Sequence, residues 1–205
     1  MSPPPAATLL ALLAALPFAA SLLLACFPNR ARSLVAWVAG LATLAGCALL
    51  ASAAGPVFDG EVLRWSVAWM PALGLELGFR MDGLAWLFAL LILGIGALVV
   101  LYAAYYLHHE DPPARFFMFL MLFMGAMLGV VLADNLVLLV VFWELTSLAS
   151  FLLIGYWSHR RDARQGARMA LAITGGGGLC LLAGVLLLGH VAGSYRLDDV
   201  LAAGP

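Results

Sequence analysis

Six long apolar runs constrain the fold of this chain more than any other feature of its sequence. Crossing about 30 Å of hydrocarbon takes roughly 17–25 residues of helix at about 1.5 Å per residue. The runs occupy residues 6–27, 34–54, 83–107, 116–133, 135–157 and 167–190. Because unpaired backbone groups are costly in hydrocarbon, each run is predicted to be a helix. The predicted fold class is therefore an all-α integral membrane protein with six transmembrane helices.

The composition agrees with this fold class and excludes several functions. Of 205 residues, 65% are hydrophobic and only 10% are charged, against roughly 25% charged residues in a soluble domain. All ten basic residues are arginines and the net charge is −1, so we expect no nucleic-acid partner. The three cysteines are isolated in apolar runs, which is typical of packing residues rather than of a disulfide or metal framework.

The distribution of arginines predicts the orientation in the membrane. With the N-terminus outside, seven arginines fall in the cytoplasmic connections and three outside. The positive-inside rule then places both termini outside the cell membrane. The arginine-rich stretch at 158–168 is predicted to be a cytoplasmic connection that fixes this topology.

One connection, at residues 55–82, is long enough to hold structure of its own. Apolar and polar side chains alternate over 62–69 and again over 73–80, and a period of two is typical of strands. We predict a short extracytoplasmic β-hairpin, which either covers the helices or docks a neighbouring subunit. The chain then divides into two N-terminal helices (1–54), the hairpin loop (55–82), four further helices (83–190) and an extracytoplasmic tail (191–205).

Two other polar features could in principle form sites. The stretch "HHEDPP" at 108–113 combines two imidazoles with two carboxylates but has no second set of ligands at metal-site spacing, so we expect no metal. We expect no cofactor either. The glycines at 175–178 cost helix stability of about 1 kcal/mol each relative to alanine, and they favour either a local break in the last helix or close packing.

The strongest candidate site is Glu144, in the stretch "VVFWELTSLAS" at 140–150. It lies nine residues beyond Asn135, or about 13 Å along a helix, close to the bilayer midplane. A charge at that depth needs a proton, a counter-charge or water, and intramembrane carboxylates usually belong to ion paths. Burial favours the neutral form and a nearby cation the charged one, which suits a proton carrier; a neutral glutamate joining helices is the alternative. Ser147, one turn later on the same face, is the local candidate for a hydrogen bond.

The second half of the sequence resembles a known family. The stretches "FWELTS" and "SFLLIGYW", with "MDGLAWLFALLILGIGALVVLYAAYYL" before them and "GSYRLDDVL" after, are similar to the A subunit of multisubunit monovalent cation/proton antiporters of the Mrp or Pha type. The antiporter-like subunits of respiratory complex I share the same general plan. The resemblance runs from about residue 83 to the end and more loosely through the earlier part.

The resemblance implies a function and a missing partner. In that family the glutamate of the "WEL" motif, here Glu144, takes part in proton translocation and pairs with a lysine on a later helix. Members assemble with other subunits and exchange Na⁺ or K⁺ for H⁺. This chain has no lysine, so we expect it to be a portion of a longer subunit that ends before the first repeat is complete. The alternatives are a subunit of a complex-I-like or membrane-hydrogenase proton pump, and a membrane scaffold that transports nothing.

Overall fold

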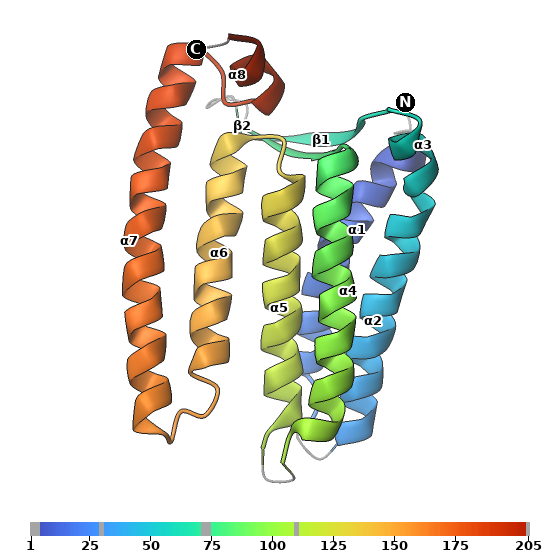
Figure 1. Cartoon of the computed structure of the whole chain (residues 1–205), viewed down its shortest axis with the longest axis vertical. Helices are drawn as coiled ribbons and strands as arrows, with labels where there is room; N and C mark the ends of the chain where they lie inside the picture. Colours follow the sequence, from blue (N-terminus) through green and yellow to red (C-terminus); the bar gives the residue numbers. More distant parts are fainter. Residues whose placement is uncertain (1–4, 29–30, 71–74, 109–110, 204–205) are drawn as a thin grey trace.

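Eight helices and two strands make up the part of the chain that the computed structural model describes, which is residues 5–28, 31–70, 75–108 and 111–203 (Figure 1). They are α1 (Pro5–Ala25), α2 (Arg32–Ser52), α3 (Ala54–Phe58), β1 (Leu63–Met70), β2 (Leu75–Met81), α4 (Gly83–Tyr106), α5 (Pro113–Leu132), α6 (Leu136–Ile154), α7 (Arg161–Ala192) and α8 (Leu197–Ala203). Helices α1, α2, α4, α5, α6 and α7 are long and apolar enough to cross a membrane. The predicted fold class is confirmed.

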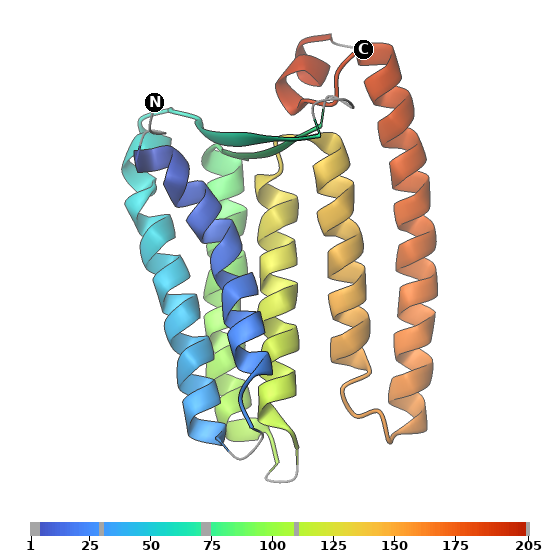
Figure 2. The same ribbon diagram turned by 180° about the vertical axis from the view of Figure 1, so that it is seen from behind.

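Four of the six long helices form a closed ring, and the other two extend from it side by side. Helices α1, α2, α4 and α5 pack around one another, and α6 then packs on α5 and α7 on α6. Figures 1 and 2 show α7 at the edge of the molecule, with α6 between it and the ring. Half of the apolar window of α5 is buried, against 11% of that of α7. The ring is therefore the packed core, while α6 and α7 present wide apolar faces outward.

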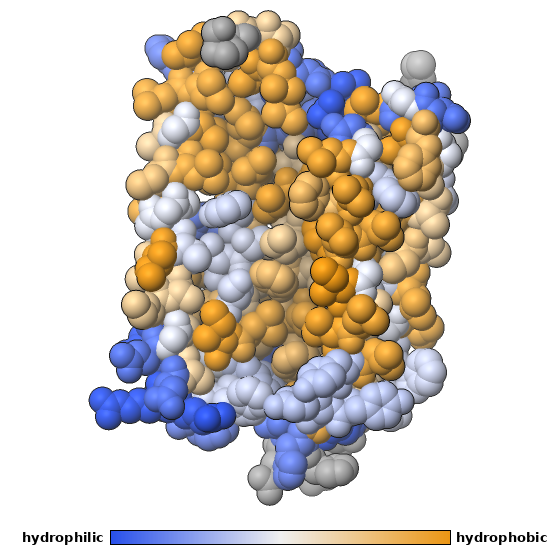
Figure 3. Space-filling model, in the orientation of Figure 1, coloured by the Kyte–Doolittle hydropathy of each residue, from blue (hydrophilic) through white to orange (hydrophobic). Residues whose placement is uncertain are grey.

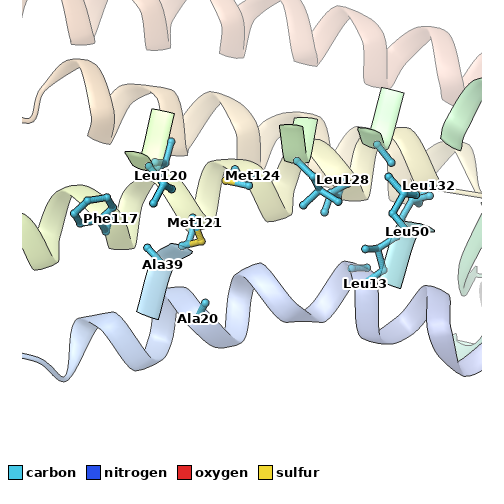
Figure 4. Close-up of a cluster of buried hydrophobic side chains, with 14 of the residues drawn as sticks. Leu13, Ala20, Ala39, Leu50, Phe117, Leu120, Met121, Met124, Leu128 and Leu132 are labelled. Carbon is cyan, nitrogen blue, oxygen red and sulfur yellow. The ribbon is translucent and has the colours of Figure 1, made fainter. Parts of the chain in front are cut away.

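The core lies along α5, where large side chains recur at helical spacing. Phe117, Met121, Leu128 and Leu132 are almost fully buried. Figure 4 shows Met121 beside Ala39 of α2, and Leu132 beside Leu50 of α2 and Leu13 of α1. Small residues on the same helix admit rings from its neighbours. A Cβ at Gly129 would overlap the ring of Phe142 on α6. This is the close helix approach that small residues permit in membranes.

The predicted hairpin is confirmed, and it lies across one end of the bundle, called the hairpin end below (Figure 1). Strands β1 and β2 pair antiparallel with Leu63 opposite Met81 and Trp65 opposite Phe79. Leu63, Phe79 and Met81 are buried, which means that the hairpin covers helix ends. The residues between the two predicted strands include 71–72, which lie outside the described residues.

Two local features differ from the sequence expectations, and a third bears on two alternatives that the sequence left open. Helix α7 begins at Arg161 instead of 167, so most of the arginine-rich stretch is helical. A helix can continue beyond the bilayer through polar residues because water forms hydrogen bonds with their side chains there. The loop at 55–82 and the tail at 191–205 contain the short helices α3 and α8. The glycines at 175–178 do not break α7, because a break would leave backbone groups unpaired at membrane depth.

The surface has the polarity of a membrane protein. Figure 3 shows apolar residues over the flank of the bundle and hydrophilic residues gathered toward its two ends. The second end, called the opposite end below, carries the start of α7 with its arginines and the connection between α4 and α5. The apolar flank between the two ends is the part that hydrocarbon would cover.

Candidate functional site

Glu144 lies in the middle of α6 and faces α7 at Gly178. The Oε1 atom of its carboxyl group is buried. A Cβ built on Gly178 would overlap this oxygen and would lie 2.7 Å from Cδ of Glu144. The carboxyl group therefore rests directly on the α7 backbone, in space that any other residue type at position 178 would fill. We call this contact the carboxyl seat.

The carboxyl seat supplies no hydrogen-bond donor. Within the described part of the chain, Oε1 of Glu144 has no hydrogen-bond partner, and none of the ion pairs found there includes Glu144. The Ser147 hydroxyl, expected to bond Glu144, donates instead to the Trp143 carbonyl at 3.3 Å. Thr146 donates to the same carbonyl at 2.6 Å. Neither hydroxyl thus takes up the role of a local partner for the carboxyl group.

Only one of the four glycines at 175–178 touches α6. A Cβ on Gly175, Gly176 or Gly177 would meet open space, whereas Gly178 is buried. The other buried residues of α7 are Ala167, Val185 and Gly189, so small residues dominate the face that α7 turns to its neighbours. Of the two interpretations of the glycine run, close packing explains Gly178, and the other three glycines have no contact that accounts for them.

A charged cluster, which the sequence reasoning missed, joins three segments at the hairpin end. Arg64 of β1 pairs with Asp198 of α8 at 2.6 Å. Arg80 of β2 pairs with Asp82 at 3.1 Å and with Asp198 at 3.6 Å. Arg64 and Asp198 are 134 positions apart in the sequence, and each looks like an ordinary loop charge there. Their meeting depends on the hairpin folding over toward the end of α7.

Backbone hydrogen bonds tie β2, α8 and the residues just before α8 to the connection between α5 and α6. The Asp134 N–H donates to the Gly78 carbonyl at 3.0 Å, and the Leu197 N–H donates to the Asp134 carbonyl at 2.9 Å. The Leu136 N–H donates to the Tyr195 carbonyl at 2.9 Å. The Asn135 side chain caps α6 by accepting from the first free N–H groups of that helix. The start of α6 is thus fixed between the hairpin and the segment after α7.

The Asp134 carboxyl group is buried inside this charged cluster. Its residue is 7% exposed, and its Oδ1 has no hydrogen-bond partner in the described ranges. Burial raises the pKa of Asp134, and the negative charge of Asp198 adds to the rise, while three arginines oppose it, namely Arg196, Arg64 and Arg80. The net upward shift means that desolvation outweighs the arginine charges.

The opposite end holds the stretch "HHEDPP", for which the sequence predicts no metal site. Oδ1 of Asp111 accepts from the Trp157 indole N–H at 2.9 Å, and the Tyr156 hydroxyl donates to the Pro112 carbonyl at 3.1 Å. Burial, followed by the charge of Asp111, raises the pKa of Tyr156 to about 12. Among the described residues no group of three metal-ligating side chains is found; residues 109–110 lie outside them. Asp111 here has a structural role, as acceptor for the indole of Trp157.

Two family models match the chain. The model described as the N-terminus of NADH-ubiquinone oxidoreductase (complex I) chain 5 matches residues 69–117. The model described as the transmembrane region of NADH:quinone oxidoreductase and Mrp antiporters matches residues 133–204. Together they cover more than half of the chain, which belongs to this family of antiporter-like membrane subunits.

Relatives narrow the family further. The chain is 53% identical over 197 residues to a probable K⁺/H⁺ antiporter A/B subunit of Rhizobium meliloti, in a match that covers 96% of this chain and 20% of the relative. It is 48% identical over 143 residues to the Na⁺/H⁺ antiporter A subunit of Alkalihalophilus pseudofirmus, covering 69% and 18%. The chain is therefore similar to the A subunits of Mrp-type antiporters, and it spans about a fifth of the length of these relatives.

Solved structures share the fold. The Mrp complex from Dietzia sp. matches with a TM-score of 0.77 and 34% identity, over 94% of this chain and 20% of that one. An archaeal membrane-bound sulfane sulfur reductase matches with a TM-score of 0.74 over 92% and 29%, but its 18% identity shows the fold alone. The fold thus occurs in both an antiporter complex and a respiratory complex.

Proposed function

We propose that this chain is part of an antiporter subunit that exchanges Na⁺ or K⁺ for H⁺, and that Glu144 carries the proton. The carboxyl seat carries the proposal, because it holds an ionisable group at membrane depth with one oxygen buried against a backbone that offers no donor. A charge there requires compensation, and a proton provides it within this part of the chain. The relatives are named Na⁺/H⁺ and K⁺/H⁺ antiporter subunits, which supports Na⁺ or K⁺ and H⁺ as the transported ions.

The proposed setting is a multisubunit complex in a bacterial inner membrane, with the hairpin end and both termini outside. The exposed apolar faces of α6 and α7 support further protein contacts, since α7 is the least buried of the six long helices. A lysine partner for Glu144 would come from outside the 205 residues, because the chain has no lysine. The division into two helices, a hairpin loop, four helices and a tail remains part of this proposal.

The test is antiport in inverted membrane vesicles that carry the full-length subunit with its partners, followed with a pH-sensitive dye after addition of Na⁺ or K⁺. Glu144→Gln keeps the size of the side chain but cannot bind and release a proton, so cation-dependent proton movement should be lost. Glu61→Gln, at an exposed position before β1, is the matched control and should leave exchange unchanged. Wild-type exchange by a normally expressed Glu144→Gln variant would refute the role of Glu144.

The same assay separates the alternatives. A redox-linked pump would move protons only after an electron donor is added, and not in response to Na⁺ or K⁺. We consider this alternative because a complex I family model matches part of the chain. A scaffold would support assembly of the complex, and Glu144→Gln would then leave ion movement unchanged.

A further inference from the structure

A long apolar groove runs along the outer surface between α2 and α4. These two helices pack against each other in the ring, yet their outward side chains leave a hollow of about 610 Å³. Gly40 lies in its floor, where a Cβ would approach Val100 no closer than 4.0 Å. Leu41 and Leu98 form its walls and are mostly exposed. The floor and walls would thus be covered by hydrocarbon in a membrane.

One end of the groove carries a positive charge. Arg32, the first residue of α2, lines the groove at the opposite end of the bundle. One guanidinium N–H group donates to the His108 carbonyl at 2.8 Å, which holds the side chain in place, and a guanidinium group has five N–H donors. Among the residues that line the groove within the described part of the chain, Arg32 is the single cation and there is no carboxylate. The groove is therefore complementary to an anionic group joined to an apolar chain.

The dimensions of the groove match one leaflet of a bilayer. From Arg32 to Leu44, the ends of its lining on α2, twelve residues rise about 18 Å. Half of the hydrocarbon thickness is about 15 Å. Trp37 and Tyr105, near the charged end, are 67% and 85% exposed, and aromatic side chains of this kind lie at the membrane interface. The arginine would therefore lie at headgroup level and the apolar lining at acyl-chain depth.

We propose that this groove binds one acyl chain of an anionic glycerophospholipid whose phosphate pairs with Arg32. Arginine suits phosphate because its planar donors can form two parallel hydrogen bonds with it. A zwitterionic lipid would bring an ammonium group for which the described lining residues supply no carboxylate. A transmembrane helix of a partner would fill the apolar part but would leave the arginine without an anion. The lipid meets both features of the groove at once.

The experiment uses the full-length subunit purified with its partners and reconstituted in nanodiscs of phosphatidylglycerol or phosphatidylcholine with identical acyl chains. Lipids retained on the protein are counted by native mass spectrometry. A phosphatidylglycerol with a photoreactive group in one acyl chain reports where the chain lies. The wild type should retain phosphatidylglycerol in preference to phosphatidylcholine, and the photoreactive lipid should label α2 and α4 near Leu41.

Two variants and a control distinguish binding of the lipid headgroup from binding of the acyl chain. Arg32→Gln should lower retention of phosphatidylglycerol about tenfold, as expected from the loss of a charge-assisted pair. Gly40→Leu should block labelling whatever the headgroup, because it fills the floor of the groove. Arg161→Gln, at the exposed start of α7, removes an arginine at the same end but away from the groove, and should change nothing.

Three results would overturn the proposal. They are equal retention of the two lipids by the wild type, equal retention of phosphatidylglycerol by the Arg32→Gln and Arg161→Gln variants, and cross-links from α2 and α4 to a protein partner in place of the lipid. Because Arg32→Gln changes no buried apolar contact, it tests the headgroup even where Gly40→Leu fails to fold. None of these measurements depends on ion transport, so they stand apart from the role proposed for Glu144.

Discussion

Replacing Gly178 with alanine should move the Glu144 carboxyl group while leaving the fold intact. The new Cβ would overlap Oε1, and Cδ would have to retreat from 2.7 Å to at least the 3.4 Å at which ordinary contact begins. The atoms in the way belong to the end of a flexible side chain. Moving them costs about 0.5–1.5 kcal/mol if the side chain leaves its rotamer, while alanine gains about 1 kcal/mol over glycine in a helix.

The two contributions nearly cancel, so Gly178→Ala should change the free energy of unfolding by less than about 1 kcal/mol. Proton transfer should respond far more strongly, because displacing a reacting group by about 1 Å can cost roughly 100-fold in rate. Gly177→Ala is the matched control: it gains the same helix propensity, and its Cβ meets open space. It should stabilise the protein by about 1 kcal/mol and leave the exchange rate unchanged.

Exchange rates would be measured with the pH-sensitive dye in inverted vesicles, and unfolding with the same purified complexes in detergent. Infrared difference spectra of the carboxyl stretch, assigned by its loss in Glu144→Gln, report the surroundings of the Glu144 carboxyl group independently of transport. That band should shift in Gly178→Ala and stay in place in Gly177→Ala. Indistinguishable bands and rates in the two alanine variants would refute the carboxyl seat as the feature that positions Glu144.

Three further predictions concern stability. Burial raises the pKa of Asp134. The contribution of Asp134 to the free energy of unfolding is therefore full below the unfolded-state pKa of about 3.9 and is lost as pH rises through the higher folded-state pKa. Asp134→Asn should make the free energy of unfolding fall less over this pH range and should raise the melting temperature at neutral pH. Tyr156→Phe removes the hydrogen bond to the Pro112 carbonyl and should cost about 1 kcal/mol in denaturant unfolding; the cost should be constant below the ordinary tyrosine pKa of about 10 and shrink as pH rises from there through the raised pKa of about 12. Gly129→Ala drives a methyl group into the Phe142 ring and should cost roughly 1–3 kcal/mol, which Phe142→Ala in the same chain should partly restore.

The sequence predicted the helices and the hairpin because their signals are local. Apolar length identifies a transmembrane helix, and alternation of polar and apolar residues identifies a half-covered strand. Helix ends were less predictable: α7 continues to Arg161 through residues that are polar enough for a loop, because hydropathy marks where hydrocarbon ends and not where a helix ends. The same limit hid α3 and α8, which are short and mixed in composition.

The carboxyl seat was half predictable. Glu144 stood out because a carboxylate is rare at that depth, but its contact with Gly178 depends on which side of α7 faces α6. Successive residues of a helix point about 100° apart, so the glycines at 175–178 lie on nearly all sides of α7. The sequence therefore does not indicate which of the four glycines faces α6. The choice is made by packing over the whole length of α7, including Val185 and Gly189 far from the seat.

The backbone hydrogen bonds that hold Asp134 and Leu136 between the hairpin and the segment after α7 also limit how the length of the chain can vary. They fix where α6 starts, and Glu144 then follows eight residues after Leu136. One inserted residue in that stretch would turn the carboxyl group by about 100° and shift it by about 1.5 Å along the axis, away from Gly178. Substitutions between Leu136 and Glu144 are compatible with the carboxyl seat, whereas insertions and deletions are not, so a change of length by one residue should be tolerated in the loop between α6 and α7 but not between Leu136 and Glu144.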